Sequence, residues 1–370
     1  MSGVAGAQGN RFAHLDALRA VAALLVVWTH SAELFAPLAG GSALLDVAAR
    51  YDLGRIGVVA FFGVSGFLIP TSLQANRPDA GVAFLVRRCF RLFPAYWLSI
   101  PLGVLALWTL SGRSVGPGEI GLNFTMAPDL FGARPVMGSY WTLEYELAFY
   151  GLCLVLFKGG FLHARWTAAI ATSVFLALFM LGFALLLALH RQEPGDLGIV
   201  ALNFGCLFLG ALWRRHVDGQ LVGLERLALA GALAVFWVLT PAACAYAIFG
   251  HGSDNPFYVT FPVSYAAGAA VFVAMTSFAK IRWRPLVWTG LVSYSLYLLH
   301  PVVIYVMRFA FDHHWLGTGW PVGVQMLLAT AFSIGLAGIA FYAIERPSIG
   351  LGLRLTRARP TGALAAAPTT

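Results

Sequence analysis

The sequence predicts an all-α integral membrane protein, a bundle of about ten transmembrane helices with both termini in the cytoplasm. Of its 370 residues, 59% are hydrophobic and 11% are charged, whereas soluble domains carry about 25% charged residues. The mean hydropathy is +0.77. Long apolar runs recur along the chain, and the segments between them alternate in charge.

A helix needs about 20 mostly apolar residues to cross the hydrocarbon core of a bilayer. Ten runs in the chain approach or exceed this length, although glycine or proline interrupts several of them. We expect these runs to be the spans. In chain order they cover residues 15–38, 56–73, 94–110, 139–157, 166–189, 197–213, 227–249, 257–279, 285–311 and 322–344.

The connecting segments predict the direction of each span. Arginine and lysine gather in every second segment, and the remaining segments hold acidic residues beside few basic ones. By the positive-inside rule the basic segments and both termini are cytoplasmic. Topology thus explains the net charge of +8, and we expect no nucleic-acid partner. The predicted parts are a cytoplasmic tail (1–14), a transmembrane domain (15–347) and a disordered cytoplasmic tail (348–370).

Two ionisable residues lie inside the first apolar run, where charge is costly and therefore suggests function. From Arg19 to His30 a helix turns by about 1100°, close to three full turns, and rises by about 16 Å. The two side chains therefore share a face at different depths. One interpretation is an interfacial Asp16–Arg19 salt bridge, with His30 satisfied by a neighbouring helix. The other is that His30 acts as a general base.

The fourth run opens with Trp141 and carries two carboxylates, Glu144 and Glu146. Carboxylates in a membrane helix need partners or they become protonated. These two are separated by about 200° around a helix, so they cannot both face one pocket. Either both lie at the interface beside the helix N-terminus, where negative charge is favourable, or one of them lies near His30.

An arginine cluster precedes the third run. Arg88 and Arg91 are three residues apart and project from the same helix face, which suits a bidentate clamp on phosphate groups. The alternative is a topology-setting cluster on an aromatic belt. Both interpretations place the cluster on the cytoplasmic side.

Weaker signals lie elsewhere. Small residues around Ser65 in the second run permit close helix packing. His300 precedes a proline and can bond a carbonyl freed by it, and Tyr297 belongs to the same hydroxyl-rich stripe. We expect no metal site, because the four cysteines are scattered and adjacent histidines diverge on a helix. The longest connection, 111–138, is either a lid or acceptor-binding element or a plain connector.

Together these motifs resemble the acyltransferase-3 family, bacterial ten-span membrane proteins that transfer acyl groups to glycan or antibiotic hydroxyls. The resemblance covers residues 15–347. It rests on an ordered set: Leu-Asp-x-Leu-Arg; an arginine and a histidine separated by ten residues; Phe-Phe-x-x-Ser-Gly-Phe-Leu; Arg-x-x-Arg-x-x-Pro; Asn-x-Thr at Asn123; Trp-Ser-Leu-x-x-Glu from Trp141 to Glu146, with Thr142 in place of serine; Ser-Tyr-Ser-Leu-Tyr-Leu-x-His; and a closing Glu345-Arg346-Pro347.

The resemblance implies an acyl-CoA co-substrate, acetyl-CoA in the first instance, a hydroxyl acceptor on a glycan or small molecule, and a place in the bacterial cytoplasmic membrane. Arg88 and Arg91 would hold the coenzyme A phosphates, and Arg19 would guide the pantetheine arm or stabilise charge at the thioester. His30 would take the acceptor's proton, directly or through an acyl-histidine relay. Glu146 would fix the imidazole tautomer, although Glu144 leaves that assignment open. Supporting roles fall to Asp16, Ser65, Asn123, Trp141, Glu144, Tyr297 and His300.

An alternative function is a proton-coupled secondary transporter or flippase that uses His30, Arg19 and Glu146 as a relay. It predicts accumulation of substrate that depends on a proton gradient, without consumption of acyl-CoA. The sequence shows no repeat of the kind common in such transporters. A non-catalytic scaffold would leave the aligned ionisable groups unexplained.

Overall fold

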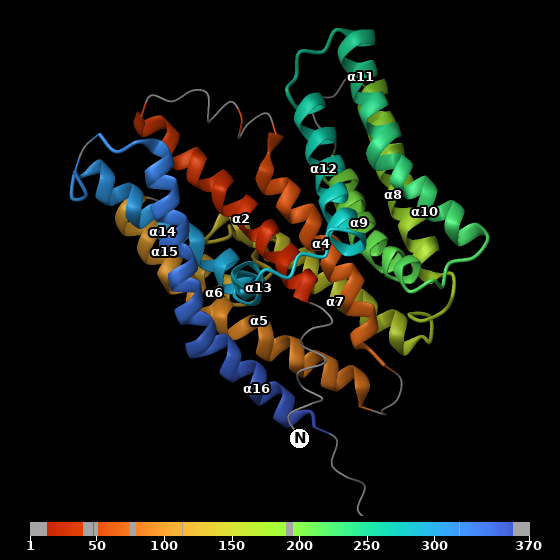
Figure 1. The fold of residues 1–370 in the computed structure, drawn as a ribbon, viewed down its shortest axis with the longest axis horizontal. Coiled ribbons are helices and arrows are strands. Elements are labelled where there is room, and N and C mark those ends of the chain that lie inside the picture. Colours follow the sequence, from red (N-terminus) through yellow and green to blue (C-terminus); the bar gives the residue numbers. More distant parts are fainter. Residues whose placement is uncertain are drawn as a thin grey trace, which may run out of the picture.

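The computed structural model describes residues 13–39, 47, 51–74, 79–112, 114–189, 195–317 and 319–357, and within them the regular elements are helices (Figure 1). In chain order these are α2 (Ala13–Phe35), η1 (Ala36–Ala39), α4 (Leu53–Ser72), α5 (Ala80–Val104), η2 (Leu105–Thr109), α6 (Pro117–Asn123), η3 (Pro128–Phe131), η4 (Gly138–Tyr140), α7 (Trp141–Lys158), α8 (Thr167–Ala188), α9 (Asp196–Val217), α10 (Leu224–Ala234), η5 (Val235–Leu239), α11 (Thr240–His251), α12 (Phe257–Ser277), α13 (Arg284–Leu291), α14 (Ser293–Asp312), α15 (Val322–Ala340), η6 (Phe341–Glu345) and α16 (Arg346–Leu355).

The predicted all-α membrane bundle is confirmed. Nine helical stretches among the described residues are long and apolar enough to cross a membrane. Helix α7 is a further helix of 18 residues, but it carries Glu144, Glu146 and Lys158 and is therefore less apolar than the nine. Together they account for the predicted number of about ten.

Three of the long stretches contain one π-helical turn. It ends the stretch after α5 (η2), and it joins α10 to α11 (η5) and α15 to α16 (η6). Because the last stretch continues to Leu355, the prediction of a disordered tail from residue 348 is wrong for residues 348–355. Side-chain bonds explain the order there, since the Arg87 guanidinium donates to the hydroxyl of Thr356 at 2.7 Å and so ties α16 to α5. The rest of the predicted tail lies outside the described residues, apart from Thr356 and Arg357.

Two predicted boundaries were wrong: close packing breaks one run into two helices, and charged residues hid the start of the other. The single run 285–311 is two helices, α13 and α14, that meet at Val292. Helix α13 lies against α2, where a Cβ on Gly290 would come within 1.8 Å of the Asp16 carbonyl oxygen. The run 94–110 likewise begins earlier, at Ala80, so that the arginine cluster lies within α5 rather than before it.

Small residues set the approach of the central helices. Helices α2 and α4 lie side by side at the centre of the bundle, with α8 to α12 on one flank and α14 to α16 on the other (Figure 1). A Cβ on Gly66 of α4 would lie 1.7 Å from the Leu207 carbonyl oxygen of α9, and one on Gly57 would lie 2.3 Å from the Ala22 carbonyl oxygen of α2. The close packing predicted for the second span is therefore confirmed.

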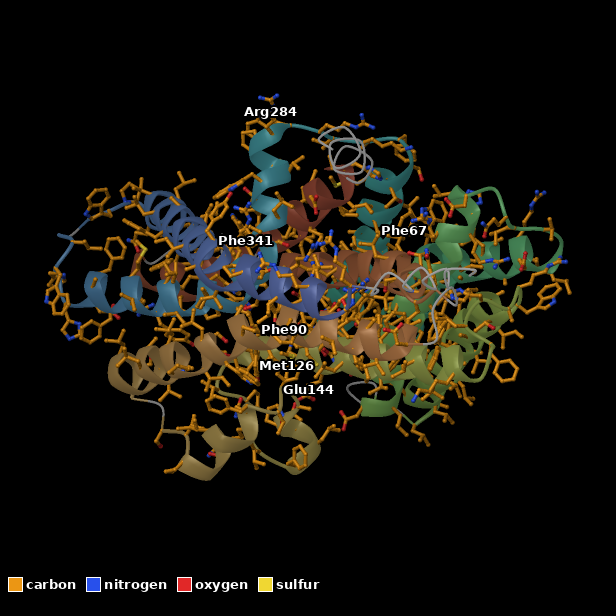
Figure 2. All side chains as sticks on the ribbon, turned by 90° about the horizontal axis from the view of Figure 1, so that it is seen from below. Phe67, Phe90, Met126, Glu144, Arg284 and Phe341 are labelled. Carbon is orange, nitrogen blue, oxygen red and sulfur yellow. The ribbon has the colours of Figure 1, made fainter. Side chains whose placement is uncertain are left out.

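Figure 2 shows Arg284 and Glu144 on opposite sides of the molecule.

Candidate functional site

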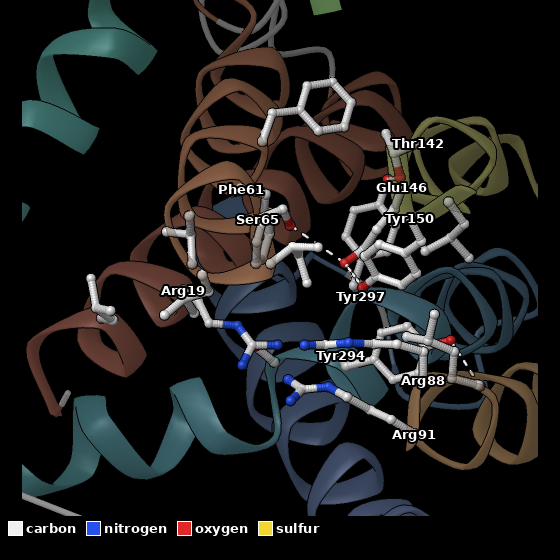
Figure 3. Close-up of a pocket in the computed structure, with 18 of the residues that line it drawn as sticks. Arg19, Phe61, Ser65, Arg88, Arg91, Thr142, Glu146, Tyr150, Tyr294 and Tyr297 are labelled. Carbon is white, nitrogen blue, oxygen red and sulfur yellow. Dashed lines mark hydrogen bonds between the residues drawn. The ribbon is translucent and has the colours of Figure 1, made fainter. Parts of the chain in front are cut away.

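A cavity of about 420 Å³ lies between α2, α4, α5, α7 and α14 (Figure 3). Its size is within the usual range for small-molecule sites. The fold thus brings together side chains from five separate sequence motifs. The residues of the predicted site that line the cavity are Asp16, Arg19, Ser65, Arg88, Arg91, Glu146 and Tyr297.

Three guanidinium groups converge in this cavity. Figure 3 shows Arg19 reaching in from α2, and Arg88 and Arg91 from α5, with their charged ends toward one another. Arg88 donates to the Ser72 hydroxyl at 3.1 Å and lies over the ring of Tyr150, 5.3 Å from its centroid. Arg19 and Arg91 make no hydrogen bond to another residue of the described part of the chain. Such a cluster favours an anionic ligand.

Glu146 faces the same cavity from α7. Its carboxylate accepts a hydrogen bond from Ser65 at 3.4 Å and another from the Tyr150 hydroxyl. Glu144 points elsewhere and accepts from the backbone N–H of Asp129 at 3.2 Å. The two carboxylates thus diverge as their spacing predicts, and of the two it is Glu146 that lines the cavity.

A second cavity, of about 440 Å³, adjoins the first. It shares Ser72, Arg88 and Arg91 with it and extends to Ile349 and Leu353 of α16. The arginines of α5 therefore stand where the two cavities meet. A ligand with several phosphate groups and a long arm can contact this cluster from both sides.

His30 lies about 16 Å along α2 from Arg19 and is not among the residues that line either cavity. Its Nδ1 lies 3.0 Å from the Glu33 carboxylate, and its ring stacks on that of His300 with centroids 5.3 Å apart. The expected pairing of His30 with Glu146 is therefore wrong for this structure. Glu146 faces the cavity that Arg19 also lines, and His30 lies outside this cavity. Sequence reasoning missed Glu33, although its spacing of three residues from His30 was a usable signal.

His300 is fully buried on α14. Its Nδ1 lies 2.8 Å from the Tyr297 carbonyl oxygen, which Pro301 leaves without its helical N–H donor. The predicted bond to a freed carbonyl is confirmed. A carbonyl can only accept, so Nδ1 carries the proton and Nε2 presents a lone pair. That buried Nε2 has no hydrogen-bond partner among the described residues.

Tyr297 forms a partition between the cavity and the two histidines. It lines the cavity, and its ring centroid lies 6.0 Å from that of His300. Its hydroxyl lies 2.7 Å from the Thr142 hydroxyl and donates to the Ser139 carbonyl at 2.9 Å. Phe61 packs edge-on against its other side. The hydrogen bonds of the Tyr297 hydroxyl join α14 to the start of α7.

Asn123 does not line the cavity but stabilises the connecting segment between α5 and α7. It is fully buried, and its amide nitrogen donates to the carbonyls of Glu119 and Arg134 at 2.8 and 3.0 Å. Its amide oxygen accepts from the Val136 N–H at 2.9 Å, so one side chain organises much of the segment between α5 and α7. In the same segment the Gly116 backbone N–H, and after it the Arg134 guanidinium, hold the pKa of Glu119 below its ordinary value.

Trp141, at the start of α7, packs against Phe62 of α4 and Tyr145 of α7.

The described part of the chain contains no cluster of three metal-ligating side chains. Among the residues that line the cavity, the three arginines are suited to hold an anionic co-substrate.

An acyltransferase domain model matches residues 12–342. The chain is 27% identical to nodulation protein 10 of Rhizobium leguminosarum bv. viciae, over 94% of this chain and 95% of the relative. It is 28% identical to the exopolysaccharide production protein ExoZ of Rhizobium meliloti, over 82% and 92%. A Bacillus subtilis protein named as a peptidoglycan O-acetyltransferase is 27% identical over 92% of this chain and 55% of its own length. No solved structure matches the chain.

Proposed function

The chain belongs to the acyltransferase-3 family of membrane acyltransferases, and we propose that it transfers an acyl group, acetyl in the first instance, from cytoplasmic acyl-CoA to a hydroxyl of a cell-surface glycan. The names of its relatives support a glycan acceptor, since they refer to exopolysaccharide production and to peptidoglycan. The proposed location is the bacterial cytoplasmic membrane, with both termini inside.

One observation carries the donor proposal: Arg19 and Arg91 face a cavity without a hydrogen-bond partner among the described residues. Both guanidinium groups lie near the carboxylates of Asp16 and Glu345 without a hydrogen bond to them, so a ligand anion can bind them directly. Coenzyme A carries phosphate groups and a long, flexible arm. The second cavity beyond Arg88 suits the phosphate-bearing end, and the first suits the arm and its thioester.

The proposed chemistry is an acyl transfer assisted by a general base. His30 Nε2 takes the proton of the acceptor hydroxyl while the oxygen attacks the thioester carbonyl. A C–O bond forms and the C–S bond breaks, and the leaving thiolate recovers the proton from the imidazolium. The ester and free coenzyme A are the products. Since Tyr297 stands between the cavity and the histidines, the proposal requires this partition to open during transfer.

The test uses the full-length protein in inverted membrane vesicles, with labelled acetyl-CoA and mass spectrometry of surface glycans. We expect His30→Ala to reach wild-type abundance and to lose about 10²–10⁴-fold in acyl transfer, because that is the usual worth of a general base. His313→Ala is the matched control, since His313 bonds the Phe309 carbonyl at the far end of α14. Acylation by His30→Ala at the wild-type rate would refute the mechanism.

The same vesicles test the transporter alternative, which the placement of Arg19 and Glu146 on one cavity of a membrane protein favours. A transporter would accumulate substrate under an imposed proton gradient and leave acetyl-CoA unconsumed. Release of coenzyme A in step with glycan acylation would exclude it as the main activity.

A further inference from the structure

We propose that Glu33 is the positioning residue of the general base: it fixes His30 in the tautomer that leaves Nε2 free, and it stabilises the imidazolium formed during transfer. This inference rests on the proposed function, because it assigns a partner to the base in that reaction. It replaces Glu146, to which the family resemblance gives this role.

The contact geometry supports the assignment. Glu33 Oε2 lies 3.0 Å from His30 Nδ1, one helical turn along α2. An ionised carboxylate can only accept, so Nδ1 donates and Nε2 keeps its lone pair. Residues three apart on a helix are neighbours by construction, so the pair needs no contact between helices to form.

A second helix, α14, contacts the flat face of the His30 ring. The His300 and His30 rings lie at 21° to each other, and His300 is itself fixed by the bond from its Nδ1 to the Tyr297 carbonyl. The carboxylate therefore constrains the edge of the His30 ring, and the buried His300 constrains its face. A base held in both ways is oriented before the substrate arrives.

Two other charged side chains near this end of α2, both in the described part of the chain, already have partners. On α14, Arg308 pairs with Asp312 at 2.8 Å and also donates to the Leu34 carbonyl. At the start of α4, Arg55 pairs with Asp52 at 2.6 Å. In contrast, Glu33 has His30 as its ion-pair partner among the described residues.

The experiment compares Glu33→Gln and Glu33→Ala in the vesicle assay, with kcat and the acyl-CoA KM measured separately. Glutamine keeps an acceptor for Nδ1 but removes the charge, whereas alanine removes both. Because His30 and Glu33 are half-exposed, we expect Glu33→Ala to lower kcat by about 10-fold, the lower end for one charge-assisted hydrogen bond, with Glu33→Gln between it and the wild type. The acyl-CoA KM should stay within about twofold, because the donor cavity is untouched. Asp254→Asn, which neutralises an exposed carboxylate in another connection, is the matched control.

Three results are decisive. A kcat within about twofold of wild type in both Glu33 variants, with His30→Ala inactive, overturns the role of Glu33 and leaves the proposed function intact. Activity in His30→Ala overturns both. A graded loss in kcat from wild type through glutamine to alanine, at constant KM, supports the inference. Should the alanine variant fail to accumulate, the isosteric Glu33→Gln carries the test alone, through a reduced kcat at constant KM.

Discussion

Replacing Arg91 by glutamine should raise the KM for acyl-CoA by about 10- to 150-fold. Its guanidinium faces the cavity and makes no hydrogen bond to another described residue, so its interactions remain available to a ligand. A hydrogen bond to a charged group contributes about 1.5–3 kcal/mol. Since about 1.36 kcal/mol corresponds to a factor of ten, the loss converts to the stated range. Relief of repulsion between Arg91 and Arg19 offsets part of this loss and favours the lower end.

Arg88 provides an internal comparison. It is already bonded to Ser72 and lies over the rings of Phe84 and Tyr150. Its removal should therefore weaken acyl-CoA binding and also lower the thermal stability of the protein, whereas Arg91→Gln should leave stability nearly unchanged.

The assay measures initial rates of acyl transfer in inverted vesicles at varied acyl-CoA and fixed acceptor, and then the reverse. Arg226→Gln is the matched control, because Arg226 is exposed and donates to the Leu221 carbonyl away from both cavities. An unchanged acyl-CoA KM in Arg91→Gln, or an equal rise in the KM values for donor and acceptor, would refute the assignment of this cavity to the donor.

Three further predictions concern the neighbouring carboxylates and the segment between α5 and α7. Glu146→Gln should reduce acyl transfer in the vesicle assay, whereas Glu144→Gln, which changes a loop contact, should mainly lower the melting temperature. Asn123→Ala leaves buried backbone groups unpaired, so it should cost about 3 kcal/mol of stability and reduce abundance without changing KM. The lowered pKa of Glu119 means that its pairing stabilises the segment above the ordinary carboxyl pKa. That contribution should disappear as the pH falls through the lowered pKa of Glu119. Limited proteolysis at a series of pH values would detect the loss as faster cleavage of the segment in acid. A cleavage rate that does not change with pH would contradict the prediction.

In the proposed reaction the donor site and the general base lie at two separate places in the molecule. The arginines hold the donor on one side of Tyr297, and the His30–Glu33 pair lies beyond it. In the proposed reaction a closed partition would keep water at the base away from the thioester until the acceptor is in place.

The sequence by itself determined the fold class, most of the spans and the helix faces on which the arginines lie. Hydropathy over about 20 residues reports whether a helix can cross a bilayer, and the period of 3.6 residues reports which side chains share a face. The same local geometry predicted that Glu144 and Glu146 diverge. It failed where charge interrupts an apolar run, as at the start of α5, and where a span is broken by packing, as at Val292.

The tertiary structure decided which faces meet. Periodicity fixes the direction of a side chain about its own helix, but contacts between helices depend on rotation and depth, which backbone contacts at Gly57, Gly66 and Gly290 set here. Contacts between helices also place Glu146 on the same cavity as Arg19, whereas His30 lies outside it. They also bring His300 onto the His30 ring, an arrangement between residues 270 positions apart that no local pattern contains.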